Sequence, residues 1–254
     1  MGKTHIVLPD PHSCPEWNQE RFKWFGKLVA DVKPDTVVCI GDWGDLGSLC
    51  TYDKGTRGYE GRRYKKDLEA IHEAQDLFFA PIKAAKKKQP RYIMLEGNHE
   101  HRIERAISQD AAQLEGIISL DDLGYEDYGW EFIKYDGSTP GVIEVDGISY
   151  AHYHTSGVMN RAISGTYPAA ALINKQYKSC TMGHSHVFDH TIRTDATGKH
   201  IHGLVCGVGT DQEMGYAGAA NKLWWRGVVI KHDVEDGHYD IETVTLKRLK
   251  EIYG

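Results

Sequence analysis

The stretch TVVCIGDWGDLG, residues 36–47, joins an unbroken apolar run to a turn that carries two acids. An apolar, β-branched run that ends at glycine is typical of a strand buried on both faces. A similar run, THIVL at residues 4–8, precedes it, and RYIML at residues 91–95 follows it. Segments with helical spacing separate the three runs, so the order predicts a βαβαβ unit with parallel strands.

Two helices are expected between these strands. Ser13 and Glu16 have capping-box spacing and Pro15 suits a first turn, so the first helix is predicted to start there and to end at the KPD of residues 33–35. In the second helix, Pro81 is expected to produce a kink or a restart. The apolar residues at helical spacing are Phe22, Phe25, Leu28, Val29 and Val32 in the first helix and Leu68, Ile71, Phe78, Phe79 and Ile82 in the second.

The second half of the chain has a different character. From Trp130 onward, short runs of strand-forming residues alternate with Gly, Asp and Asn turns, and one such run is WWRGVVIKHDV at residues 224–234. Residues 167–177 are the one helical candidate among them. A βαβαβ half joined to a strand-rich half predicts two sheets packed face to face with helices outside. The predicted fold class is α/β, as a single domain over residues 1–254 without a composition break that marks a linker.

The bulk composition excludes several classes of protein. Thirty basic and thirty-six acidic residues give a net charge of −6 with histidine neutral, so no global positive field attracts nucleic acid or lipid, and a polyanion must be recognised locally. The five cysteines are scattered without a C-x-x-C pair, which indicates a reduced compartment. The sequence has no signal-peptide pattern and no apolar run long enough to span a membrane, so we expect a cytoplasmic protein without a membrane partner.

Metal-binding residue types gather where the strand candidates end. Five short blocks follow apolar runs, and they read LPDPH, IGDWGD, LEGNHE, YAHYH and MGHSH. In a parallel sheet the carboxyl ends of the strands form the crevice where ligands bind, so we expect these blocks to converge. Each block alone is a weak signal, since an Asp after a strand is commonly a turn or a cap. Five blocks in one order are hard to obtain from unrelated turns.

The five blocks resemble the signature of the calcineurin-like metallophosphoesterases. The matching elements are D-x-H, G-D-x-x-D, G-N-H-E, a later strand-end His and G-H-x-H, and they extend from Asp10 to His186. The segments TYDKG, EGRRYKKD and LWWRGVV are similar to the subgroup carried by tailed bacteriophages, which would place the protein in a host cytoplasm. The resemblance implies a four-layer α/β/β/α sandwich of two mixed β-sheets with helices on the outer faces.

The resemblance also implies a site for two divalent metal ions. The implied ligands are Asp10, His12 and His186 for one metal, Asn98, His152 and His184 for the other, and Asp42 as the bridge. Oxygen and imidazole ligands together suit Mn, Fe, Zn or Ni rather than Ca, and Mn is the expected metal. Such a pair clamps phosphoryl oxygens and acidifies a bridging water that attacks phosphorus in line. Gly41 is expected to let the backbone turn sharply beneath Asp42.

His99 and Asp45 are the candidate catalytic residues. The Asn98 amide is implied to face a metal, so the neighbouring His99 is expected to reach toward the substrate as a proton donor or electrostatic stabiliser for the leaving oxygen. Asp45 would hold the tautomer of His99, and a helix or loop cap is the alternative role for Asp45.

The fourth block leaves a choice between two histidines. Tyr153 follows His152 where the family commonly has glycine, and His154 lies two residues on, on the same face of an extended strand. We favour His152 as the ligand because it directly ends the strand candidate. His154 remains a rival ligand or a substrate-binding residue.

Further residues are candidates for substrate binding at the rim. His101, Arg102 and Arg105 lie one to two turns past Asn98, where an ordinary charged helix face is the favoured interpretation. Residues 48–88 form an inserted loop-helix segment that is a candidate lid. Its basic cluster could bind phosphate or begin a solvated helix, and it consists of Arg62, Arg63, Lys65 and Lys66. Trp224 and Trp225 could stack a base, although core and surface positions of a strand are favoured.

The sequence also bears on the class of ester. Leu46 and Gly47 follow the second block, where the protein Ser/Thr phosphatases have arginine, and the block lacks the metal-binding tyrosine of purple acid phosphatases. The H-x-H ending resembles the branch that includes nucleases and other phosphodiesterases. The predicted function is therefore phosphodiester hydrolysis in nucleic acid or a nucleotide. The alternatives are a phosphomonoesterase, a protein phosphatase, or a metal-binding protein without activity.

Overall fold

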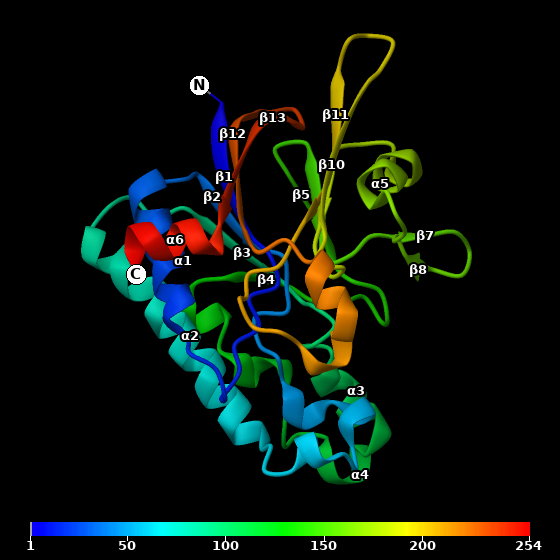
Figure 1. Ribbon diagram of the computed structural model, residues 1–254. Helices are drawn as coiled ribbons and strands as arrows, with labels where there is room; N and C mark the ends of the chain where they lie inside the picture. Colours follow the sequence, from blue (N-terminus) through cyan, green and yellow to red (C-terminus); the bar gives the residue numbers. More distant parts are fainter. Residues whose placement is uncertain (1) are drawn as a thin grey trace.

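Two mixed β-sheets form the centre of the protein in a computed structural model that describes residues 2–254 (Figure 1). The first sheet has the order β13-β12-β1-β2-β3-β4. Strands β1 to β4 run parallel, β12 is antiparallel to β1, and β13 is antiparallel to β12. Its strands are β1 (Lys3–Leu8), β2 (Thr36–Cys39), β3 (Arg91–Leu95), β4 (Glu131–Ile133), β12 (Gly227–Glu235) and β13 (His238–Thr245).

The second sheet has the order β10-β11-β9-β6-β5, and its three central strands are parallel. Its strands are β5 (Val142–Val145), β6 (Ile148–Ala151), β9 (Cys180–Met182), β10 (Phe188–Thr194) and β11 (His200–Cys206). A short separate hairpin consists of β7 (Thr155–Ser156) and β8 (Arg161–Ala162).

The first sheet is buried on both faces because its apolar strands alternate between two cores. In β1, Ile6 and Leu8 face the helices while Val7 faces the second sheet. The same alternation recurs in β2, where Val37 belongs to the helical core and Val38 to the core between the sheets. Because successive side chains of a strand point to opposite faces of the sheet, every residue of an unbroken apolar run is buried in one of the two cores.

Helices cover the outer faces of both sheets (Figure 1). On the first sheet lie α1 (Glu20–Val32), α2 (Tyr64–Ala85) and α6 (Leu246–Tyr253), and on the second lies α5 (Pro168–Gln176). Two further helices, α3 (Arg102–Gln109) and α4 (Ala111–Leu114), follow β3 beyond the end of the sheet. The arrangement confirms the predicted α/β fold with four layers.

Several expected boundaries are wrong. Helix α1 begins at Glu20 rather than near Ser13, because Ser13 pairs its backbone with Trp43 and Asp45 and so ties the first loop to the second. Pro81 does not restart the helix, because it lies inside α2, which continues to Ala85, and a kink at Pro81 stays a prediction. The C-terminal helix α6 was not predicted.

Strand β12 begins at Gly227, so the two tryptophans before it belong to a loop and not to a strand. The candidate lid also divides into two parts. The buried residues of α2 belong to the helical core, and only the loop before Tyr64 lies near the strand ends. The lid therefore stays a prediction for that loop alone.

Two other sequence features are seen directly. All five cysteines are free and buried. Within residues 2–254, no helix combines the length and the apolar character that crossing a membrane requires.

Candidate metal centre

Loops at the carboxyl ends of five strands bring the candidate residues together. The loop after β1 supplies Asp10 and His12, that after β2 supplies Asp42 and Asp45, and that after β3 supplies Asn98 and His99. The second sheet contributes His152 after β6 and His184 and His186 after β9. Both sheets therefore point the ends of their parallel strands at one place.

One group of side chains forms around His186. Its Nε2 lies 3.2 Å from Asp10 Oδ2 and 3.3 Å from His12 Nε2. Asp10 and His12 are fully buried and His186 is 5% exposed. The three side chains predicted to share one metal are thus within contact distance of one another.

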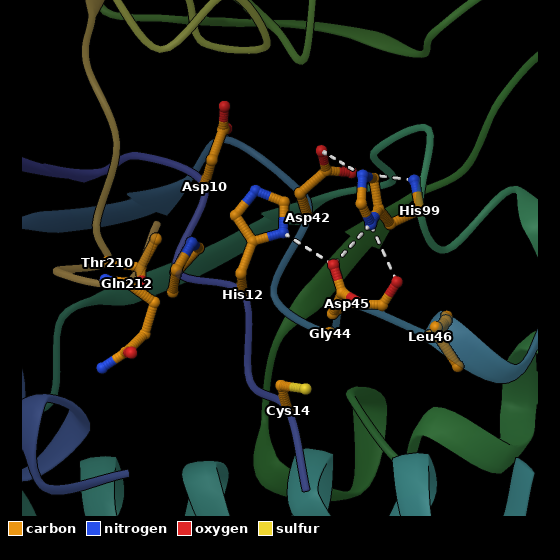
Figure 2. A network of polar contacts seen from close by, with 12 residues as sticks. Asp10, His12, Cys14, Asp42, Gly44, Asp45, Leu46, His99, Thr210 and Gln212 are labelled. Carbon is orange, nitrogen blue, oxygen red and sulfur yellow. Dashed lines mark hydrogen bonds and ion pairs between the residues drawn. The ribbon is translucent and has the colours of Figure 1, made fainter. Parts of the chain in front are cut away.

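A second group forms around the Asn98 amide. Asn98 Oδ1 lies 2.9 Å from His152 Nε2 and 2.7 Å from His184 Nδ1. His152 Nε2 is also 3.4 Å from Asp42 Oδ2, and Asp42 Oδ1 accepts the backbone N–H of His99 at 2.9 Å. Asp42 therefore borders this group directly. Figure 2 shows the Asp42 carboxylate between the side chains of His12 and His99.

The backbone at these positions is strained. Five of the candidate residues have a positive backbone φ, a conformation that residues other than glycine rarely adopt. They are Asp10, His12, Asp42, His184 and His186. Gly41 has a φ of 103°, and a Cβ there would lie 2.8 Å from the backbone N of Gly97 and 3.0 Å from His152 Nδ1. The expectation of a sharp turn under Asp42 is confirmed. Strained backbone conformations persist only where the surrounding structure enforces them, and they occur often at functional sites.

Glu100 anchors two of the loops. Its Oε2 accepts the backbone N–H groups of Asp42 and Gly97, each at 2.9 Å, and its Oε1 accepts Gly44 N–H at 3.1 Å and the Tyr125 hydroxyl at 2.9 Å. The side chain is fully buried, and burial raises its pKa. This role of Glu100 was not predicted from the sequence. Its position as the last residue of the G-N-H-E block is the one sequence feature that indicated it.

Asp45 lies between two histidines (Figure 2). Its Oδ1 is 3.2 Å from His99 Nδ1 and 3.6 Å from His12 Nδ1, and its backbone oxygen is 2.8 Å from His99 Nδ1. These three side chains form a compact cluster of potential ligands. Asp45 is not a helix cap, because the 3₁₀ helix η1 (Gly47–Leu49) begins after Leu46 and lacks a side-chain cap bond.

Arg102 completes the surroundings of His99. Its Nη2 donates to His99 Nε2 at 3.2 Å, and its Nη1 donates to the backbone oxygen of Asp45 at 2.7 Å. The residue is only 9% exposed. The favoured interpretation of Arg102 as part of a charged helix face is therefore wrong.

Of the other rim candidates, the exposed Arg105 reaches the Asn98 backbone oxygen at 3.5 Å, and two histidines lie elsewhere. His101 stacks on Tyr135 and pairs with Glu96 at 2.9 Å. His154 is buried against the backbone of Ser149 and Thr181, and the structure does not bring it to Asn98.

The residues of the basic cluster differ in what their side chains contact. Arg62 binds Asp53 at 2.7 Å and the backbone oxygen of Gly47, whereas Arg63 is exposed and reaches only the backbone oxygen of Arg62. Lys65 and Lys66 are exposed on α2.

The donor atoms fit divalent cations. His152 Nδ1 lies 2.9 Å from the Ile40 backbone oxygen, which can only accept, so in the neutral ring Nε2 carries a lone pair. That lone pair faces the oxygens of Asn98 and Asp42 with no donor hydrogen between them. Asp10 Oδ1 is likewise buried and has no hydrogen-bond partner among the described residues. Converging acceptors are costly unless a cation lies between them.

The protonation states suit the same purpose. Burial lowers the pKa of His12 and of His184 to about 4, so both imidazoles are neutral at neutral pH. Burial alone would raise the pKa of Asp42, but His152, His99 and His12 hold it below its ordinary value. Neutral imidazoles and an ionised carboxylate are the forms in which these groups bind metals.

A cavity of about 520 Å³ opens over these residues. The metal-ligand candidates on its floor are Asp42, Asn98, His184 and His186, beside His99 and Arg102. Its other lining residues come from two loops and include Tyr52, Asp53, Ala217, Ala220 and Trp224. A substrate in this cavity would contact the candidate ligands and Arg102 together.

Three comparisons relate the chain to known proteins. The Gene 54 protein of Mycobacterium phage D29 is 29% identical over 133 residues, which cover 49% of this chain and 50% of the relative, so the chain spans about half of that protein. Protein TT1561 of Thermus thermophilus has a TM-score of 0.44 at 10% identity, over 97% of this chain and all of that chain. A dimetal phosphatase from Danio rerio has a TM-score of 0.43 at 11% identity, over 96% of this chain and 99% of that chain.

These two structural similarities are too low to carry an argument, and family membership rests on the sequence. A family model described as calcineurin-like phosphoesterase matches residues 4–253. Because this match spans nearly the whole chain, the protein belongs to the calcineurin-like phosphoesterases.

Proposed function

We propose that the protein is a dinuclear-metal phosphodiesterase that acts on nucleic acid or a nucleotide. Membership in the family implies two divalent cations. The observation that carries the choice of a diester is the lining of the cavity. Among its described lining residues Arg102 is the one arginine or lysine, and much of the remaining wall is apolar. A diester carries one negative charge and two organic groups, so it needs less positive charge and more apolar contact than a monoester dianion.

We assign the ligands according to the two groups of contacts. Asp10, His12 and His186 would hold one ion, and Asn98, His152 and His184 the other. Asp42 would lie between them as the shared carboxylate. When bound, the two cations supply positive charge at the phosphoryl oxygens and lower the pKa of a water molecule. Manganese is the proposed metal, because the oxygen and imidazole donors suit it.

The remaining residues of the centre act on the substrate. We assign His99 to the leaving oxygen, as its electrostatic stabiliser or, once Arg102 has turned from His99 Nε2 to the phosphoryl group, as its proton donor. We assign Asp45 to orienting the His99 ring through Nδ1. Arg102 holds a positive charge beside His99 Nε2, where a negative phosphoryl group would bind. Glu100 keeps the loops of Asp42 and Gly97 in register through three backbone hydrogen bonds, and the Tyr125 hydroxyl donates a fourth.

The test compares two chromogenic esters on protein reconstituted with manganese. Hydrolysis of bis(p-nitrophenyl) phosphate should exceed that of p-nitrophenyl phosphate in kcat/KM. A strong preference for the monoester would overturn the proposal and would favour a phosphomonoesterase. A panel of single-stranded DNA, RNA and cyclic dinucleotides then identifies the diester class. A location in the cytoplasm remains a prediction.

A further inference from the structure

The cavity over the metal centre has two unlike walls. One wall is polar and consists of the metal-ligand candidates with His99 and Arg102. A second part of the lining is contributed by the 3₁₀ helix η2 (Thr51–Asp53) and by the loop of η6 (Gly215–Leu223, orange in Figure 1). Its apolar members are Tyr52, Ala217, Ala220 and Trp224. Two aromatic side chains from distant parts of the sequence thus line the cavity that contains the metal-ligand candidates.

Trp224 is fixed directly beside one of these candidates. Its indole ring lies perpendicular to the His186 imidazole, with ring centroids 4.2 Å apart and an interplanar angle of 88°. The Arg226 guanidinium carbon lies over the indole ring, 5.6 Å from its centroid, and this cation–π contact also holds the ring in place. Trp224 nevertheless remains partly exposed and lines the cavity, so the indole can contact a planar group bound there.

The loop before Trp224 is held in place. The buried Asn221 side chain accepts the Met214 backbone N–H at 2.9 Å and donates to the backbone oxygens of Met214 and Gly218 at 2.9 and 3.0 Å. The backbone N–H of Trp224 donates to the Asn221 backbone oxygen at 3.4 Å. The indole is therefore positioned before a ligand arrives, which reduces the entropy lost on binding.

Tyr52 is exposed although it lines the same cavity. Its side chain is 85% exposed, so it contributes little to the core. The loop around it is tied down by the Tyr59 hydroxyl, which donates to the Ser48 backbone oxygen at 2.5 Å, and by the Arg62–Asp53 ion pair. Tyr52 thus places an aromatic ring at the open edge of the cavity, where a bound ligand can contact it.

From this geometry we propose that Tyr52 and Trp224 bind a planar aromatic group that is attached to the reacting phosphate, namely the base of a nucleotide. This inference rests on the proposed function and names the part of the substrate that gives selectivity. Aromatic side chains stack on every base, so the subsite favours nucleotides over simple esters without selecting a sequence. The phosphate would bind at the polar wall beside Arg102 while the base contacts the aromatic wall.

The test measures binding of two ligands that share a phosphate but differ in the base. Isothermal titration calorimetry with manganese-loaded protein compares thymidine 5′-monophosphate with methyl phosphate. We expect the nucleotide to bind the wild type about tenfold or more tightly. Trp224→Ala should reduce this ratio about tenfold, Tyr52→Ala should reduce it by a smaller factor, and Trp224→Phe should largely retain it.

A matched control is Tyr167→Ala, since Tyr167 is 74% exposed but does not line the cavity. This variant should keep the wild-type ratio. Equal affinity of the wild type for the two ligands, or an unchanged ratio in Trp224→Ala and Tyr52→Ala, would overturn the inference. Hydrolysis of bis(p-nitrophenyl) phosphate by the same samples separates the two proposals. Diester hydrolysis without base preference refutes only the subsite, and base preference without diester hydrolysis refutes only the proposed function.

Discussion

Arg102 Nη2 donates a hydrogen bond to His99 Nε2 across 3.2 Å, and Nη1 of the same guanidinium donates to the Asp45 backbone oxygen at 2.7 Å. One side chain from α3 thus holds both the candidate catalytic histidine and the loop that orients it. The planar fork of arginine makes two directed contacts at once, which the point charge of lysine does not reproduce.

Replacing Arg102 should therefore reduce turnover. Arg102→Met is expected to lower kcat by about tenfold to a hundredfold, because the charge beside the phosphoryl group and the support of His99 are both lost. Arg102→Lys should recover only part of this rate. Steady-state kinetics with a diester substrate measure the effect. Arg63→Met is the control, since Arg63 is exposed and contacts only the Arg62 backbone, and a similar loss in that variant would contradict the role of Arg102.

His99 and Asp42 should differ in what they support. His99→Ala is expected to keep both metals and to lose about a hundredfold or more in kcat, because His99 acts on the substrate. Asp42→Asn is expected to lower metal retention, because an amide cannot supply the negative charge of a bridging carboxylate. Elemental analysis after desalting and steady-state rates give both readouts. Unchanged activity in both variants would refute the assignment.

The two histidines of the fourth block provide a paired test of the ligand set. His152→Ala is expected to reduce metal content by about one ion per chain, since His152 Nε2 borders Asn98 and Asp42. His154→Ala should leave the number of metals per folded chain unchanged, because His154 is buried against Ser149 and Thr181 instead. Metal content of the soluble fraction is the measurement. Metal loss in His154→Ala alone would reverse the choice.

Gly97 should tolerate no side chain. A Cβ at this position would lie 2.1 Å from Asp42 Oδ1 and 2.3 Å from the Asp42 backbone N, so the loops after β2 and β3 would have to separate. Gly97→Ala is expected to cost about 1–3 kcal/mol in unfolding free energy and to weaken metal binding. Urea unfolding and metal titration measure the two effects. Gly58→Ala serves as the comparison, because a Cβ at Gly58 meets nothing within 4 Å.

Lys231 should make stability depend on pH. It is fully buried between the sheets, where its Nζ lies 2.5 Å from Thr181 Oγ1 and 3.2 Å from the Tyr150 hydroxyl. Burial lowers its pKa from 10.5 to about 7. Between these two values the unfolded chain binds a proton that the folded protein does not, so the unfolding free energy contributed by Lys231 rises with pH in that window. Below pH 7 both states are protonated and the contribution is constant.

The Lys231→Met variant isolates this effect. Buried cysteines and tyrosines with raised pKa values, such as Cys206 and Tyr150, oppose it at high pH, so the wild type is compared with the variant at each pH. The difference in unfolding free energy should change by up to about 1 kcal/mol per pH unit between pH 7 and 10. Urea unfolding across this range measures it. A difference that does not vary with pH would show that the pKa of Lys231 is not depressed in the folded state.

Much of the fold followed from local pattern. The runs that contain Ile6, Val38 and Ile93 are apolar without interruption, and only a strand covered on both faces buries such a run completely. The start of α1 did not follow, because Ser13 bonds to Trp43 and Asp45, residues about thirty positions away, instead of capping a helix. Capping-box spacing is a local signal, and a competing tertiary contact overrides it.

The sequence by itself determined the layered α/β fold and the blocks that carry the candidate ligands, because strand burial and polar residues after strands are both properties of short segments. Only the tertiary structure separated His152 from His154, since both lie on one face of an extended segment and their distance from Asn98 depends on how the second sheet packs on the first. It also placed Arg102 against His99 and Trp224 against His186, contacts that depend on the positions of whole loops. Residues far apart in the chain meet only when the sheets and loops are assembled, so no local pattern encodes those distances.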